Sequence, residues 1–290
     1  MTSLLNTTPL TSYMGVELHD LDLAEPPSEA TAEAIRQALA EHTLLLVRGQ
    51  SHISPEQHIA FSRLFGPLEA HVLQNFCLDG HPEIFVVSNI VENGRHIGAY
   101  GGSKVFHSDL LYLDEPSLGS VFRCLECPSG TGQTAFASLF AVYDALPEER
   151  KRWLAGRNIV YDYVWYYERH HTDRPKLSEE QKARVPPVAH PAVRLHPVTG
   201  RPGLFYSPTW ARRFEDMSEA ESKPILDELT ALSTDERFVY YHEWTPGDVL
   251  IWDNRASMHK ACPFDEQNSR RLMHRTTIKG DRPIGLDLAA

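Results

Sequence analysis

Helical periodicity marks four segments of the chain. The clearest begins at Ser54, an N-cap residue that Gln57 completes as a capping box, with Pro55 in the first turn and Gly66 at the end. The apolar spacing also predicts a restart at Pro147 and a kink or restart at Pro224. We therefore predict helices over residues 28–42, 54–66, 138–154 and 217–232.

Runs of apolar residues bounded by turn signals predict many strands. They occupy residues 42–50, 83–91, 105–113, 117–126, 132–139, 192–197, 202–207, 237–244, 248–253 and 270–280. These strands outnumber the crossover helices too heavily for a doubly wound parallel sheet. The pattern favours a mainly β fold with flanking helices, built as a double-stranded β-helix, that is, a jelly-roll or cupin-like barrel.

Two segments interrupt this pattern. Residues 92–104 are rich in glycine and predict a mobile loop, whereas residues 161–191 begin with crowded aromatic residues and continue with charges. We expect both to be lid-like insertions over a site. Because no linker divides the chain, residues 1–290 are expected to form a single domain.

The charge and cysteine content argue against several classes of binding partner and cofactor. A formal net charge of −11 disfavours binding to a nucleic acid, and no apolar run approaches the ~18 residues that span a membrane. The N-terminus lacks the pattern of a secretory signal, which predicts a cytoplasmic protein. Cys124 and Cys127 form a C-x-x-C without a second pair, so free thiols are favoured over a zinc or redox site.

The stretch VFHSDLLYL, residues 105–113, carries the candidate chemistry. In a strand, His107 and Asp109 would point to the same face, and a half-buried carboxylate requires a partner. His259 lies at the end of a later strand and supplies a third ligand. Two histidines and one carboxylate form the facial triad of non-haem iron(II) oxygenases.

Two arginines follow His259. Arg271 lies 12 residues beyond it, and strand alternation places Arg271 and Arg275 on one face, about 13 Å apart. Guanidinium groups on a barrel face are costly unless they bind anions. The spacing therefore predicts an anion site beside the metal.

The sequence resembles the taurine dioxygenase / 2,4-dichlorophenoxyacetate dioxygenase family of Fe(II)- and 2-oxoglutarate-dependent enzymes. The resemblance covers nearly the whole chain, in segments such as LLLVRGQ, FHSD, CPSGTGQT, GDVLIWDNRASMH and RRLMHRTTIKGD. It implies that His107, Asp109 and His259 bind Fe(II), and that Arg271, rather than Arg270, binds 2-oxoglutarate together with Thr134. The loop HIGAYGGSK does not match that of the taurine enzyme, which argues against taurine as the substrate.

The same resemblance implies a substrate site. Arg275 would meet an anionic group of the substrate, and His71 would face the substrate. The aromatic pocket residues implied by position are Tyr112, Tyr167 and Trp210, with Tyr166 as a further candidate. Packing within the core is the alternative role for these aromatic residues and for His71.

The implied reaction is the O2-dependent hydroxylation of a small organic anion, coupled to decarboxylation of 2-oxoglutarate to succinate and CO2. A sulfonate, sulfate ester, phosphonate, aryloxy acid or amino-derived acid would suit the site. Family members are commonly dimers or tetramers, so a homo-oligomer is expected. Two alternatives remain open at this point: a zinc-dependent hydrolase on the same triad, and a non-catalytic barrel that binds a metal or ligand.

Overall fold

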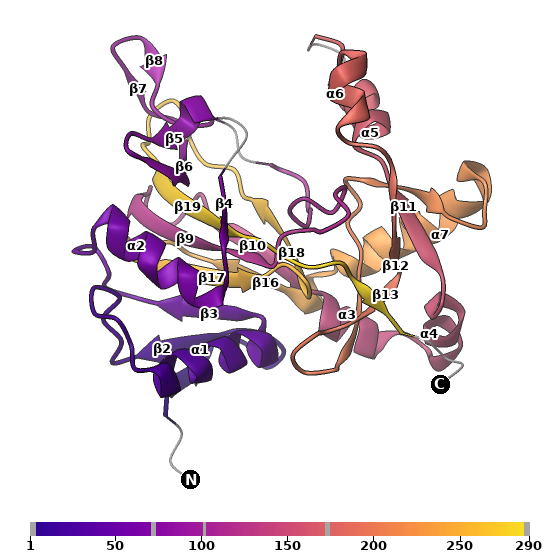
Figure 1. Ribbon diagram of the computed structural model, residues 1–290, viewed down its shortest axis with the longest axis horizontal. Helices are drawn as coiled ribbons and strands as arrows, with labels where there is room; N and C mark the ends of the chain where they lie inside the picture. Colours follow the sequence, from indigo (N-terminus) through magenta and orange to yellow (C-terminus); the bar gives the residue numbers. More distant parts are fainter. Residues whose placement is uncertain (1–3, 71–73, 101–102, 172–174, 287–290) are drawn as a thin grey trace.

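The protein is mainly β, as predicted, with helices flanking its sheets (Figure 1). The computed structural model describes residues 4–70, 74–100, 103–171 and 175–286. Its largest sheet has nine strands in the order β1-β2-β3-β17-β9-β19-β6-β5, with β4 paired to β19. These strands span Asn6–Pro9 (β1), Val16–His19 (β2), Leu44–Val47 (β3), Val249–Asp253 (β17), Gly119–Glu126 (β9), Leu272–Ile278 (β19), His81–Ser88 (β6), Cys77–Leu78 (β5) and Leu68–Glu69 (β4).

A smaller sheet shares a cluster of buried apolar residues with the large one. It comprises β16 (Val239–His242), β10 (Thr134–Ser138) and β18 (Ser257–Ala261), in that order. Two further three-stranded sheets extend the molecule. They consist of β12 (Val188–Pro191), β11 (Asn158–Tyr161) and β15 (Ala211–Phe214), and of β14 (Pro202–Leu204), β13 (Val193–Leu195) and β20 (Ile284–Gly285).

The helices largely follow the predicted boundaries. They are α1 (Glu29–His42), α2 (Pro55–Ser62), α3 (Leu139–Ala145), α4 (Glu148–Leu154), α5 (Tyr163–His170), α6 (Glu179–Ala183) and α7 (Glu219–Ser233), with 3-10 turns at Arg63–Phe65, Gln74–Phe76 and Glu236–Phe238. The capping box of Ser54 with Gln57 and the break before α4 are confirmed. Across the described residues, each helix is too short or too polar to cross a membrane.

Of the kink or restart predicted at Pro224, the restart is wrong, because α7 runs from Glu219 to Ser233 without interruption. Proline removes one backbone donor and frees the carbonyl four residues earlier. Both Pro224 and Ala220 are exposed, so water can replace that hydrogen bond. The helix therefore tolerates the proline on its solvent side.

The core explains why β3 is apolar at every position. Leu45 and Val47 pack with Ile35 and Leu39 of α1, whereas Leu44 and Leu46 belong to a cluster on the other face of the sheet. Burying each such side chain contributes about 1.5–3 kcal/mol. That second cluster includes Phe122 and Trp252 of the large sheet, Phe136 of β10 and Trp244 just beyond β16, so it joins the two sheets directly behind the site.

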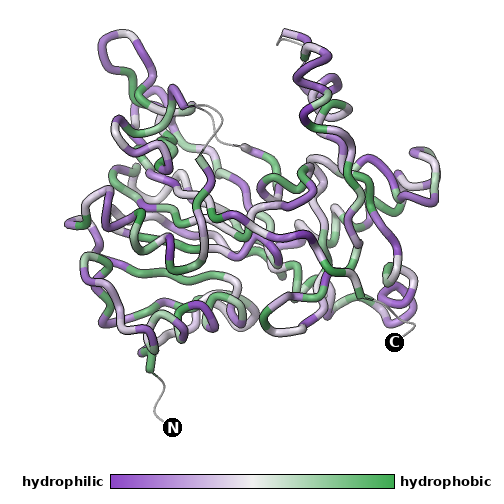
Figure 2. Tube along the Cα trace, viewed as in Figure 1, coloured by the Kyte–Doolittle hydropathy of each residue, from purple (hydrophilic) through white to green (hydrophobic). Residues whose placement is uncertain are grey.

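Two projections rise from the body in Figure 1, and Figure 2 shows that both are mostly hydrophilic. One is a hairpin of β7 (Val91–Glu92) and β8 (Arg95–His96), which corrects the prediction of a mobile loop over this part of residues 92–104. Asn93 and Gly94 both have positive φ, the conformation of a tight two-residue hairpin turn. The other projection carries α5 and α6, within the predicted insertion of residues 161–191.

Candidate active site

Three side chains from two distant segments converge between the large and small sheets. Ligand atoms of His107, Asp109 and His259 all lie within 4.8 Å of one another. The Nε2 atom of His107 is 3.7 Å from Oδ1 of Asp109, and Nε2 of His259 is 3.9 Å from Oδ2. The structure thus brings together the three residues selected from the sequence as metal ligands.

The segment that carries His107 and Asp109 is not a strand, which corrects the prediction over residues 105–113. His107 makes a single antiparallel bridge to His259, through two backbone hydrogen bonds of 3.0 and 2.9 Å. The chain then turns, and Leu110 takes a positive φ of 58°. The turn is held by Asn254, whose side chain accepts from the amide N–H of Asp109 at 2.7 Å and donates to its carbonyl at 2.9 Å.

The two imidazoles are oriented by different means. Nδ1 of His107 lies 3.1 Å from the carbonyl of Val105, and since a carbonyl only accepts, this nitrogen carries the proton and leaves Nε2 free to bind a metal. The ring of His259 is instead packed against Trp252 and Phe136, with ring centroids 4.7 and 6.0 Å away. Its buried Nδ1 has no hydrogen-bond partner among the described residues.

The electrostatics place all three groups in the protonation states that bind metals. Burial and the neighbouring His107 lower the pKa of His259 to about 3, and burial also lowers the pKa of His107. Burial alone would raise the pKa of Asp109, but Arg275 and the two histidines lower it to about 2. Neutral imidazoles and an ionised carboxylate form a donor set that fits Fe(II).

A cavity of about 80 Å³ is lined by His107 and His259 and also by Arg271. Arg271 is only 7% exposed, and no carboxylate of the described residues lies within ion-pair distance of it. Its Nε–H has no acceptor among them, although the guanidinium lies over the Phe122 ring, 5.7 Å from its centroid. A buried cation without an anionic partner is costly, so the part of the cavity beside Arg271 fits an anion.

Arg270, the neighbour of Arg271, lies in a different environment. Arg270 is exposed and its Nε donates to Glu126 at 2.8 Å, outside the cavity. Thr134 of β10, by comparison, is 4% exposed and lines the cavity together with Arg271. The structure therefore places Arg271 and Thr134, and not Arg270, in the lining of this cavity.

Comparison with known proteins supplies the family. Residues 6–277 match the family model described as "Taurine catabolism dioxygenase TauD, TfdA family". The chain belongs to the TauD/TfdA family.

Relatives of this TauD/TfdA chain are named as dioxygenases. It is 31% identical over 280 residues to the alpha-ketoglutarate-dependent 2,4-dichlorophenoxyacetate dioxygenase of Cupriavidus pinatubonensis, covering 93% of this chain and 96% of that protein. It is 30% identical to the alpha-ketoglutarate-dependent sulfate ester dioxygenase of Pseudomonas putida, covering 98% and 92%. The protein is thus a 2-oxoglutarate-dependent (alpha-ketoglutarate-dependent) dioxygenase.

The fold agrees with that assignment. The crystal structure of AAD-2 in complex with Mn(II) and N-oxalylglycine superposes with a TM-score of 0.79 at 28% identity. The match covers 96% of this chain and 98% of that one. The mainly β architecture of this TauD/TfdA chain is therefore that of TauD-type dioxygenases.

A larger cavity of about 410 Å³ is lined by both His107 and Asp109. Tyr112 and Trp210 line it, with ring centroids 4.9 Å apart. Tyr166 also lines it, 4.9 Å from Trp210, but Tyr167 does not. The implied role of Tyr167 as a pocket residue is corrected here, because its hydroxyl instead donates to the carbonyl of Pro175 at 2.8 Å.

Arg275 lines both cavities of this TauD/TfdA chain. Its Nη1 lies 3.4 and 3.5 Å from the two carboxylate oxygens of Asp109, and its buried Nε has no acceptor among the described residues. Arg275 thus has donor capacity left beside the larger cavity. His71, the other residue expected to face the substrate, lies outside the described residues.

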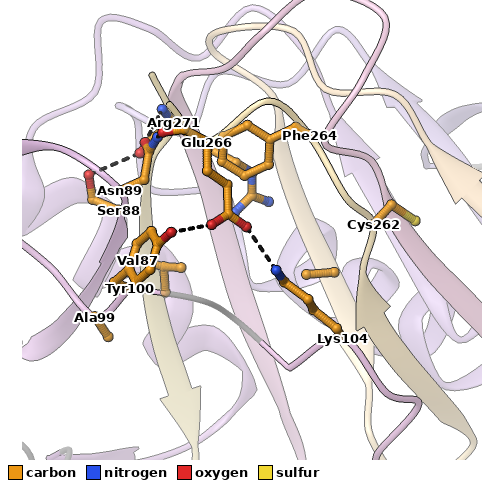
Figure 3. A pocket seen from close by; sticks show the side chains of 11 residues that line it. Val87, Ser88, Asn89, Ala99, Tyr100, Lys104, Cys262, Phe264, Glu266 and Arg271 are labelled. Atoms are coloured by element: carbon orange, nitrogen blue, oxygen red, sulfur yellow. Dashed lines mark hydrogen bonds and ion pairs between the residues drawn. The ribbon is translucent and has the colours of Figure 1, made fainter. Parts of the chain in front are cut away.

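A small cleft beside Arg271 is crossed by a set of polar contacts (Figure 3). The Glu266 carboxylate accepts a hydrogen bond from the Tyr100 hydroxyl and lies 3.1 Å from Nζ of Lys104. Asn89 accepts from the amide N–H of Arg271 at 2.8 Å and donates to the carbonyl of Glu266 at 2.9 Å. These contacts tie the segments before His107 and before Arg271 to each other.

Sequence reasoning missed two groups of residues at this site. Asn254, which holds Asp109, follows a buried strand, and the sequence around it does not predict a contact with such a distant residue. Trp252 and Phe136, which pack against His259, read as ordinary core residues. Their roles follow only from which strands are adjacent.

Proposed function

We propose that this TauD/TfdA chain uses Fe(II), 2-oxoglutarate and O2 to hydroxylate a small organic anion, releasing succinate and CO2. The observation that carries the proposal is the buried guanidinium of Arg271, which has no carboxylate partner among the described residues and lines the same cavity as His107 and His259. A hydrolase on the same triad has no use for this cation.

His107, Asp109 and His259 would hold the metal through two neutral imidazoles and one carboxylate. Fe(II) bound there would supply the open coordination positions and the redox chemistry that activates O2. Asn254 fixes the backbone of Asp109, and the carbonyl of Val105 fixes the tautomer of His107. These contacts orient the donors before a metal arrives.

Arg271 and Thr134 would hold the far carboxylate of 2-oxoglutarate. A guanidinium matches a carboxylate in a bidentate pair, and a threonine hydroxyl adds one donor. Both side chains line the same cavity as the two histidines, and both are nine-tenths or more buried. The cosubstrate would then reach from these residues toward the metal with little water around it.

The larger cavity would hold the primary substrate. Tyr112, Tyr166 and Trp210 offer aromatic surface, and Arg275 offers a cation near Asp109. This combination suits an organic anion such as a sulfonate, sulfate ester, phosphonate, aryloxy acid or amino-derived carboxylate. The relatives named for 2,4-dichlorophenoxyacetate and for sulfate esters are consistent with this class.

We extend the proposal to the architecture. The large and small sheets would form a double-stranded β-helix (jelly roll) in a single domain of residues 1–290. The segments near 92–104 and 161–191 would act as lids, and the hydrophilic hairpin β7–β8 and the helices α5–α6 are the parts of them that project from the body. His71 would face the substrate, the enzyme would form a dimer or tetramer, and a cytoplasmic location is expected.

A panel of organic anions tests the function. The Fe(II)-loaded protein is incubated with 2-oxoglutarate and each candidate, and succinate formation and O2 uptake are measured together. We expect at least one anion to give succinate and oxidised product in equal amounts. Metal-dependent hydrolysis of a panel member, with no succinate from any of them, would contradict the proposal.

A further inference from the structure

Thr134 has a hydrogen bond that limits what its hydroxyl can do. The indole Nε1–H of Trp244 donates to Oγ1 of Thr134 at 3.0 Å, and both residues are 4% exposed. An indole N–H is only a donor, whereas a hydroxyl has one donor and two acceptor sites. The oxygen of Thr134 therefore accepts from Trp244 and keeps its own proton for another acceptor.

No such acceptor is present among the described residues, where Trp244 is the hydrogen-bond partner of the Thr134 hydroxyl. Thr134 lines the same cavity as Arg271, whose Nε–H also lacks an acceptor among those residues. Two residues with unused buried donors thus line one cavity. A buried donor without an acceptor is destabilising, so the pair is suited to an incoming carboxylate.

Trp244 itself does not line that cavity, and other contacts fix its ring. Its ring lies edge-on to His242 and to Phe122, with centroids 4.4 and 5.4 Å away and both interplanar angles at 88°. The Cys127 thiol donates to the backbone carbonyl of Trp244 at 3.3 Å. Thr134 is itself placed by β10, where it pairs with His242 of β16.

We infer that Trp244 is a positioning residue for cosubstrate binding: its indole N–H orients the Thr134 hydroxyl so that the hydroxyl proton points to the carboxylate bound by Arg271. The inference rests on the proposed 2-oxoglutarate site. Trp244 acts through Thr134 rather than by touching the cosubstrate. A purely structural tryptophan would support the whole cavity, whereas this one should affect only ligands that bear the far carboxylate.

The test compares two keto acids that differ at that carboxylate. Binding of 2-oxoglutarate and of 2-oxopentanoate, which lacks the far carboxylate, is measured by calorimetry on the Mn(II)-loaded protein without O2. Trp244→Phe keeps an aromatic ring but removes the N–H. We expect it to weaken 2-oxoglutarate binding by about three- to tenfold, the value of one hydrogen bond, and to leave 2-oxopentanoate unchanged.

A double-mutant cycle tests whether Trp244 acts through Thr134. Thr134→Val removes the hydroxyl and should cause a similar loss, and the double variant should lose little more than either single variant. Equal weakening of both keto acids by Trp244→Phe, or fully additive losses, would overturn the inference. If the wild-type protein binds the two acids equally and Arg271→Ala changes neither, the proposed cosubstrate site itself is wrong.

A second measurement needs no change at Trp244. The chain has five tryptophans, so the 15N-labelled protein loaded with diamagnetic Zn(II) gives at most five indole N–H signals. Thr134→Val should shift one of them, because it removes that indole's acceptor, whereas Thr134→Ser should restore the wild-type position. Five signals unmoved by Thr134→Val would show that the contact does not exist in solution.

Discussion

The two ends of the active site come from different kinds of secondary structure and differ in exposure to solvent. The inner end is formed by Arg271, which directly precedes β19, and by Thr134 of β10, and both side chains are buried. The outer wall, formed by Tyr112, Tyr166 and Trp210, comes from a turn, the projecting helix α5 and a loop, and all three side chains are partly exposed. The inner residues lie in or next to paired strands, whereas the outer residues lie in segments that connect the strands.

Under the proposed function, this difference would separate cosubstrate binding, which relatives share, from substrate binding, which varies among them. A cosubstrate shared by a family needs fixed donors, which paired strands supply. A substrate that differs between relatives is recognised by segments that change without disturbing the core. Changes at the inner end should therefore alter 2-oxoglutarate binding, and changes at the outer wall should alter only substrate choice.

Removing a metal ligand should have the largest effect, because both ends depend on the metal between them. Asp109→Ala and His107→Ala should abolish substrate oxidation and reduce Fe(II) binding. Asp227→Ala provides the control, since Asp227 pairs with Lys223 on exposed α7 and should retain full activity. If a variant that binds no Fe(II) oxidised the substrate normally, the reaction would not take place at this site.

A buried charge cluster lies at the end of β17, directly before Asn254. Asp253, at the end of β17, accepts hydrogen bonds from Arg255 at 2.8 and 2.6 Å and from His196 at 3.0 Å. Asp253→Asn should lower the free energy of unfolding by about 3–5 kcal/mol, because Arg255 is left buried without its anion. Urea denaturation measures this, with Asp227→Asn as an exposed control expected to lose less than about 1 kcal/mol.

The same cluster predicts a pH dependence of stability. Burial opposes ionisation of Asp253, but Arg255 and His196 outweigh it and hold the pKa of this carboxyl well below its usual range. A depressed pKa stabilises the fold above the ordinary aspartate pKa of about 4, and this contribution is lost as the pH falls toward the folded-state value. The stability gap between wild type and Asp253→Asn should therefore shrink from about pH 5 downward.

The arginine pair tests the inner end directly. Arg271→Ala should raise the KM for 2-oxoglutarate by about 100-fold, since a buried charge pair is worth roughly 2–5 kcal/mol. Arg270→Ala, its neighbour on the exposed side, should change that KM by less than about threefold. Steady-state succinate formation measures both values, and equal effects would show that the wrong arginine has been assigned.

The aromatic pair tests the outer wall, with the smallest expected effect. Tyr166→Ala should raise the KM for an aromatic substrate by about tenfold, because it removes buried aromatic surface, and leave the KM for 2-oxoglutarate unchanged. Tyr167→Ala is the matched control and should affect neither KM strongly. A larger rise in the substrate KM from Tyr167→Ala than from Tyr166→Ala would show that Tyr167, and not Tyr166, lines the cavity.

The sequence predicted elements whose signals are local. The capping box at Ser54, the break at Pro147 and the fully apolar strand β3 depend on neighbouring residues, and all were found. The hairpin β7–β8 also had a local signal, Asn93-Gly94 between short strands, which the glycine content of the segment obscured.

What could not be predicted depends on distant partners. The turn at Asp109 exists because Asn254, 145 residues away, occupies both its backbone groups. Tyr166 rather than Tyr167 faces the cavity because α5 is helical, which places Tyr167 over Tyr163 instead. That helix was not predicted, so its phase could not be used.

The most direct measurement is an anaerobic titration of the Fe(II)-loaded protein with 2-oxoglutarate, followed by visible absorption. Bidentate binding of the keto acid to Fe(II) should give a weak charge-transfer band in the wild-type protein. His259→Ala should abolish the band, and Arg271→Ala should shift its appearance to much higher 2-oxoglutarate concentration, while Arg270→Ala follows the wild type. No band in the wild type, or a band unaffected by His259→Ala, would contradict the assignment of this site.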